Sequence, residues 1–120
     1  MAIEIPGLDA ENGLNLCDGN MKIYLKSLHL FVSSTPASLE KMKNVSQETL
    51  EKYSATAHSL KSMSDYAGAE EVRKTARELE ALARAGDLAG VMAKNEAFIK
   101  FAGSIVDGVR IWLEKNDPTP

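Results

Sequence analysis

Proline is confined to four positions, 6, 36, 118 and 120, so none falls within the 81 residues from Ala37 to Asp117. Because proline lacks a backbone N–H and clashes with the preceding helical turn, a long stretch without proline permits long helices. Apolar residues in this stretch recur every three or four positions, which is the period of an amphipathic helix. No segment shows the sustained alternation typical of a strand. The sequence therefore predicts a mostly helical chain.

Four amphipathic segments and one short N-terminal turn can be traced along the chain. The long segments cover about residues 20–44, 46–67, 69–85 and 87–113. Ser46 and Asp87 are placed to cap the second and fourth, and Gly68 and Gly86 to end the second and third. Pro36 marks either a kink in the first segment or a cap with proline at the first helical position. Because the connections are short, we predict an all-α fold, an antiparallel four-helix bundle with a short N-terminal capping helix at about residues 9–16.

The length of the chain indicates a single domain. A chain of 120 residues is near the commonest domain size and has no room for a second lobe. We predict one domain over residues 1–120, with a core from about residue 5 to 115 and a frayed tail at 116–120. No secretory signal and no run of 18 apolar residues is present. Together with the lone Cys17, this predicts a cytoplasmic protein.

Composition excludes several classes of function. The net charge of -3 gives no positive field for a phosphate backbone, so no nucleic-acid partner is expected. One cysteine and two histidines cannot build the usual zinc site or a disulfide framework. The sequence has no glycine-rich phosphate loop and no serine nucleophile elbow. We therefore predict no cofactor, no bound metal, no membrane insertion and no self-sufficient enzyme.

His58 is the strongest candidate for chemistry. A helix turns about 100° per residue, which places His58 roughly 130° from the apolar face of its segment and therefore toward solvent. The residues one turn away are the small Ser54, Ala55 and Ser62, together with Lys61. An exposed imidazole with room around it and an ammonium group nearby is a plausible nucleophile for phosphoryl transfer. The alternative is a solvated surface histidine beside an incidental lysine.

The other polar groups favour structural roles. His29 lies between Leu28 and Leu30 in an apolar stretch, which indicates a structural or boundary histidine. Segment 69–85 mixes glutamates with arginines and lysines, a pattern that usually forms a solvated face held by weak pairs. From the pattern alone, Glu80 is an exposed helix glutamate.

The order of motifs resembles a known family. Ala57-His58-Ser59-Leu60-Lys61-Ser62 is followed by Gly68-Ala69 and then by Ala76-Arg77-Glu78-Leu79-Glu80. This order is similar to the Ala-His-x-Leu-Lys-Gly, Gly-Ala and Ala-x-x-Leu-Glu pattern of histidine-containing phosphotransfer (HPt) domains in multistep two-component phosphorelays. The upstream Pro6-Gly7-Leu8-Asp9, Gly13-Leu14, Gly19-Asn20 and Tyr24-Leu25 resemble the usual lead-in of that family. The resemblance extends from about residue 5 to 114.

The resemblance implies a phosphocarrier rather than an enzyme. His58 would accept a phosphoryl group from the aspartyl phosphate of a receiver domain and pass it to another receiver aspartate. Lys61 matches the lysine that steadies the phosphoryl group. Glu80 matches a polar position that reaches the imidazole from the next helix, where a carboxylate can fix the tautomer. The receiver supplies the Mg²⁺, so the chain itself needs no cofactor.

The resemblance also implies the partners. These are a response-regulator receiver domain, a hybrid sensor histidine kinase, or both, and the chain is expected to be a monomer because it already carries four helices. Receiver docking is predicted at Ser54, Ala55, Ser59, Ser62 and Asp65. Ser62 replaces the family glycine, and we expect transfer to survive with an altered partner choice or rate. The alternative is a helical adaptor, or a pseudo-HPt domain that binds a receiver without phosphotransfer.

Overall fold

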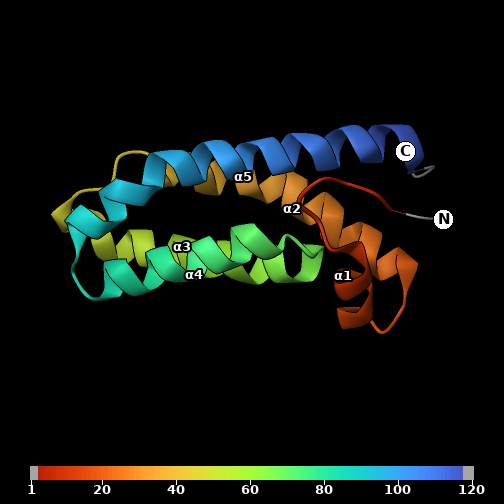
Figure 1. Cartoon of the computed structure of the whole chain (residues 1–120), viewed down its shortest axis with the longest axis horizontal. Helices are drawn as coiled ribbons and strands as arrows, with labels where there is room; N and C mark the ends of the chain where they lie inside the picture. Colours follow the sequence, from red (N-terminus) through yellow and green to blue (C-terminus); the bar gives the residue numbers. More distant parts are fainter. Residues whose placement is uncertain (1–2, 118–120) are drawn as a thin grey trace.

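The computed structural model describes residues 3–117 as a short helix followed by a bundle of four long helices. The elements are α1 (Ala10–Leu16), α2 (Met21–Met42), the 3-10 turn η1 (Gln47–Thr49), α3 (Leu50–Ala67), α4 (Glu70–Arg84) and α5 (Leu88–Asn116). In Figure 1, α5 lies along α2, α3 and α4 lie beside each other, and α1 covers one end of the α3–α4 pair. No strand occurs within the described residues. The predicted all-α bundle with a short N-terminal helix is confirmed.

All four long helices contribute fully buried side chains to one core. The larger apolar ones include Tyr24, Leu28 and Phe31 from α2, Leu60 from α3, Val72 and Leu79 from α4, and Val91 and Val109 from α5. The spacing of the three α2 residues places them on one helix face. Burying a large apolar side chain contributes about 1.5–3 kcal/mol. The core therefore determines which face of each helix is left for solvent.

Of the two side-chain caps that the sequence predicts, Asp87 and Ser46, the structure confirms the first. The Asp87 carboxylate accepts a hydrogen bond from the backbone N–H of Gly90 at 2.9 Å and so caps α5, as predicted. Ser46 behaves differently, because its backbone N–H donates to Thr49 Oγ1 at 2.8 Å and the residues after it form η1. The α-helix itself begins at Leu50. The predicted start at Ser46 is thus a 3-10 turn that leads into α3.

Gly68 forms the turn between α3 and α4. Its φ of +81° lies in the left-handed region that L side chains rarely adopt, and its carbonyl accepts from the Asp9 backbone N–H at 2.7 Å. The Tyr24 hydroxyl donates to the Ala67 carbonyl at 2.7 Å in a buried position. Backbone from the start of α1 and a side chain of α2 therefore hold this turn. The position of this turn sets how α4 lies beside α3.

We predict that Gly68→Ala destabilises the protein by more than about 2 kcal/mol, because it combines left-handed backbone strain with a steric clash. A Cβ at Gly68 would lie 2.2 Å from the Asp9 backbone oxygen. Gly86→Ala is the matched control: its φ is +76°, but a Cβ there meets nothing within 4 Å. The control should lose only about 1 kcal/mol. Urea unfolding measures both losses, and equal losses in the two variants would contradict the clash at Asp9.

The helix α2 continues through Pro36. Because α2 begins at Met21 and ends at Met42, Pro36 is not a first helical residue, and the cap alternative is wrong. The pyrrolidine ring is exposed, whereas the preceding Thr35 is buried. A proline inside a helix removes one backbone hydrogen bond. The rest of α2 is held by its apolar face.

One residue of the predicted frayed tail, 116–120, belongs to a helix. Asn116 is the last residue of α5, and its side-chain amide donates to the Trp112 carbonyl at 3.0 Å. Asp117 follows, with its Oδ2 atom 2.5 Å from Nε2 of His29. This contact joins α2 to the end of α5 and gives His29 the boundary role that the apolar stretch indicated. The remaining residues of the predicted tail, 118–120, lie outside the described residues.

Candidate functional site

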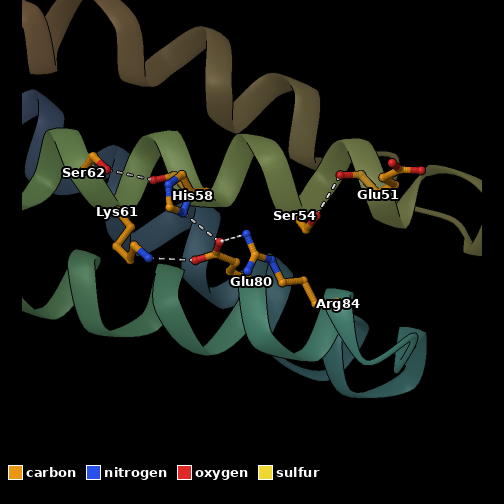
Figure 2. Close-up of polar contacts among 7 residues, drawn as sticks. All are labelled: Glu51, Ser54, His58, Lys61, Ser62, Glu80 and Arg84. Carbon is orange, nitrogen blue, oxygen red and sulfur yellow. Dashed lines mark hydrogen bonds and ion pairs between the residues drawn. The ribbon is translucent and has the colours of Figure 1, made fainter.

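The candidate site lies on the exposed side of α3, where it faces α4. Ala57 and Leu60 are fully buried in the core, which turns His58 toward solvent. The His58 side chain is 53% exposed, so the predicted outward orientation is confirmed. Figure 2 shows the imidazole above α4, with Lys61 one turn further along α3.

Glu80 of α4 connects the basic groups of the site. Its Oε2 atom lies 2.8 Å from Nδ1 of His58 and 2.9 Å from Nη2 of Arg84, and its Oε1 atom accepts from Nζ of Lys61 at 2.9 Å (Figure 2). Its side chain is only 6% exposed, so the alternative of an exposed helix glutamate is wrong. One buried carboxylate therefore joins two basic side chains of α3 to one of α4.

The surroundings of Glu80 keep it ionised. Burial raises its pKa, but the hydrogen bonds from Lys61 and His58 and the positive charges of Lys61 and Arg84 lower it by more. The net result is a pKa below the usual value of 4.5. At neutral pH the side chain is a carboxylate, which can only accept hydrogen bonds.

The two ring nitrogens of His58 are therefore in different environments. Because Glu80 can only accept, Nδ1 must carry the proton of the hydrogen bond between them. In the neutral ring, the lone pair is then on Nε2. Nε2 has no hydrogen-bond partner within residues 3–117. The arrangement gives a half-exposed imidazole with one nitrogen held and one nitrogen open.

Arg84 is a member of the site that the sequence did not single out. It lies one turn after Glu80 on α4 and forms an ion pair with it, although its own side chain is 66% exposed. Sequence reasoning placed Arg84 on a solvated face of mixed charge. The i,i+4 spacing from Glu80 was the available signal, but it has meaning only once Glu80 is known to be buried.

Most of the residues predicted to meet a receiver lie at the surface near His58. Ala55, Ser59 and Ser62 are exposed, and Asp65 is partly exposed. The Ser62 hydroxyl donates weakly to the His58 backbone carbonyl at 3.4 Å (Figure 2). The added hydroxymethyl group therefore lies along the helix surface, one turn from the imidazole.

Ser54 differs from the prediction. It is only 9% exposed, and its hydroxyl donates to the Glu51 carbonyl at 2.8 Å. At about 100° per residue, it lies closer to the core direction of α3 than His58 does. Ser54 is therefore removed from the set of docking residues.

Within residues 3–117 no three or more histidine, cysteine, aspartate or glutamate side chains are grouped so that they could hold a metal ion. In the same part of the chain, no helix has the length and hydropathy that crossing a bilayer requires. The polar cluster around His58 is thus a set of basic groups around one carboxylate.

Comparison with known proteins identifies the class of the chain. The family model of the Hpt domain matches residues 26–107, a range that includes His58, Lys61 and Glu80. No curated protein and no solved structure gives a significant match. The family match covers more than half of the chain, so the chain belongs to the Hpt domain family. Members of this family are histidine phosphocarriers of phosphorelays.

Proposed function

We propose that the chain carries a phosphoryl group on Nε2 of His58, received from the aspartyl phosphate of a receiver domain and passed to another receiver aspartate. The observation that carries this proposal is the Nδ1 hydrogen bond to the buried Glu80, which holds the ring and leaves Nε2 open. The family match supports the reaction class. The proposed role of the chain is that of a carrier and not of an enzyme.

The transfer step follows from the tautomer. The Nε2 lone pair attacks the phosphorus atom, an N–P bond forms, and the P–O bond to the aspartyl carboxylate breaks with its electron pair leaving on that carboxylate. No proton must leave Nε2, because the ring proton is on Nδ1. The phosphorylated ring is positively charged and faces the Glu80 carboxylate at 2.8 Å. Transfer to the second receiver is the reverse step with another aspartate.

Lys61 and Arg84 supply positive charge at the site. The Lys61 Nζ atom and the Arg84 Nη2 atom each lie 2.9 Å from a carboxylate oxygen of Glu80, and both side chains reach the surface beside the imidazole. A phosphoryl group on Nε2 brings negative charge to this surface, and we propose that the Lys61 ammonium turns partly toward it. The Mg²⁺ that assists the reaction belongs to the receiver, so the chain contributes only the nucleophile, its orientation and a docking face.

The partners are a response-regulator receiver domain, a hybrid sensor histidine kinase, or both. The four long helices already cover one core, which supports a monomer. We place the protein in the cytoplasm because its single cysteine suits a reducing compartment.

Incubation with phosphorylated receiver domains tests the proposal. We expect the wild-type chain to acquire a label that is labile in acid and stable in alkali, as a phosphoramidate bond on a histidine requires. A panel of purified receiver domains, each phosphorylated with a small-molecule donor, supplies the phosphoryl group. Binding of a receiver without any label would instead identify an adaptor that performs no transfer.

A further inference from the structure

A buried chain of hydrogen bonds joins three helices at one end of the bundle. The Tyr53 hydroxyl of α3 donates to Oδ1 of Asn95 on α5 at 2.8 Å, and Nδ2 of Asn95 donates to the backbone carbonyl of Met42 at 2.8 Å. Met42 is the last residue of α2, so its carbonyl has no N–H partner within that helix. Asn95 is only 6% exposed and Tyr53 only 3%. The chemistry proposed at His58 uses none of these groups.

Asn95 interrupts an apolar seam on α5. Six buried residues of this helix are spaced alternately four and three positions apart, namely Val91, Asn95, Phe98, Ala102, Ile105 and Val109. This is the heptad spacing of helices that pack side by side along their length. The whole of α5 lies within the described residues, and Asn95 is its one buried polar residue. An apolar residue at position 95 would continue the seam without a break.

Apolar residues outside the seam make other arrangements of α5 possible. Met92, Phe101 and Ile111 are 61%, 40% and 48% exposed, and at about 100° per residue they lie on other faces of the helix than the seam. Rolling α5 about its axis would therefore still bury apolar side chains. Pairing the seam with that of a second chain would do the same, because heptad spacing suits any helix of the same spacing. Apolar burial alone does not select one arrangement.

The hydrogen bonds of Asn95 distinguish the native arrangement from these alternatives. In the native arrangement the amide pairs both the Tyr53 hydroxyl and the Met42 carbonyl. With α5 rolled or exchanged, these two groups would face an apolar side chain, and a buried polar group without a partner is costly. The native bonds themselves contribute little net stability, because each group gives up a bond to water to form them. The network therefore penalises wrong arrangements more than it strengthens the native one.

We infer that the hydrogen-bond chain of Tyr53, Asn95 and Met42 is a register lock, which fixes one face of α5 in the core and keeps the four long helices within one chain. A single buried asparagine in a heptad seam has this effect in coiled coils, where it selects register and number of helices at a cost in stability. The inference does not depend on the phosphotransfer proposed for His58. It supports the proposed monomer.

The double variant Tyr53→Phe/Asn95→Leu tests the register lock. Leucine has the branched shape of asparagine, and phenylalanine lacks only the hydroxyl, so the seam stays filled. We expect proton–nitrogen NMR spectra to show a second set of amide cross-peaks with at least about a tenth of the intensity. In sedimentation equilibrium, the mass should rise from that of the monomer toward twice that value as the concentration increases. The wild type should give one set of cross-peaks and the monomer mass.

Ile105→Leu is the matched control, because it changes the same seam without touching a polar group. It should give one set of cross-peaks and the monomer mass, and the same heterogeneity as in the double variant would overturn the inference. A double variant with one set of cross-peaks and the monomer mass at every concentration would overturn it as well, because apolar packing alone would then select the arrangement.

Thermal unfolding of the double variant separates register from stability. We expect an unfolding temperature near that of the wild type, because an apolar pair of similar shape replaces the hydrogen-bonded pair. A double variant that does not fold, or that unfolds more than about 10 °C below the wild type, would overturn the inference. The network would then supply stability to the bundle and not select its arrangement.

Discussion

His58→Gln is expected to abolish labelling by phosphorylated receivers completely while the helical bundle survives. The glutamine amide has no nucleophilic nitrogen, but its N–H group can still donate to the Glu80 carboxylate as Nδ1 does. The side chain is half exposed, so its replacement disturbs no core packing. The amount of acid-labile label per chain measures the transfer, and circular dichroism with thermal unfolding shows whether the helical bundle survives.

His29→Gln is the matched control for this variant. It removes the only other histidine of the chain, which is also about half exposed and also hydrogen-bonded to a carboxylate, that of Asp117. Its labelling should equal that of the wild type. If the label persists in His58→Gln and disappears in His29→Gln, His29 and not His58 carries the phosphoryl group.

Glu80→Ala is expected to slow the transfer step by about 10²-fold, the order of loss that follows when a reacting group is misplaced by about 1 Å. Without the carboxylate, the imidazole loses the acceptor that fixes its tautomer, and Lys61 and Arg84 lose their common partner. Single-turnover transfer at saturating receiver measures the rate constant of the step. The KM for the receiver should stay within about twofold, since Glu80 is buried beneath the surface.

Glu80→Gln separates orientation from charge. Its amide oxygen can still accept from Nδ1, so it should recover part of the rate lost in Glu80→Ala.

Glu80→Gln also tests how the stability of the protein depends on pH. The folded state lowers the pKa of Glu80 below its usual value of 4.5. The carboxylate therefore stabilises the folded state above pH 4.5, and this stabilisation is lost as the pH falls through the lower pKa of the folded state. The difference in unfolding free energy between wild type and Glu80→Gln should therefore shrink on acidification from pH 7. A difference in unfolding free energy that grows on acidification would show that folding raises the pKa of Glu80 instead of lowering it.

The helices and the outward orientation of His58 were predictable from sequence because both depend on one helix at a time. Apolar spacing and glycine stops placed the long helices to within a few residues, and the angle around α3 alone turned His58 outward. The angular position of a residue around one helix could not show whether a neighbouring helix covers it when it lies between the core face and the solvent face. Ser54 is therefore buried against expectation, and Glu80 is buried although its own segment looked solvated.

The groups missed by the sequence depend on how helices are placed beside one another. Arg84 joined the site only because α4 lies beside α3 with Glu80 facing inward. An apolar hollow of about 260 Å³ forms where Leu30 of α2 lies near Met63 and Tyr66 of α3, residues more than thirty positions apart in the chain. Periodicity within either helix carries no information about that meeting.

The two-residue connection at Gly68 and Ala69 has an evolutionary consequence. It keeps every group of the proposed chemistry on one helical hairpin, from His58 on α3 to Arg84 on α4, whereas α2 contributes none of these groups. Substitutions on α2 can therefore leave the imidazole and its carboxylate in place. Duplicated copies of the chain can thus diverge on α2 while they keep every group of the proposed chemistry.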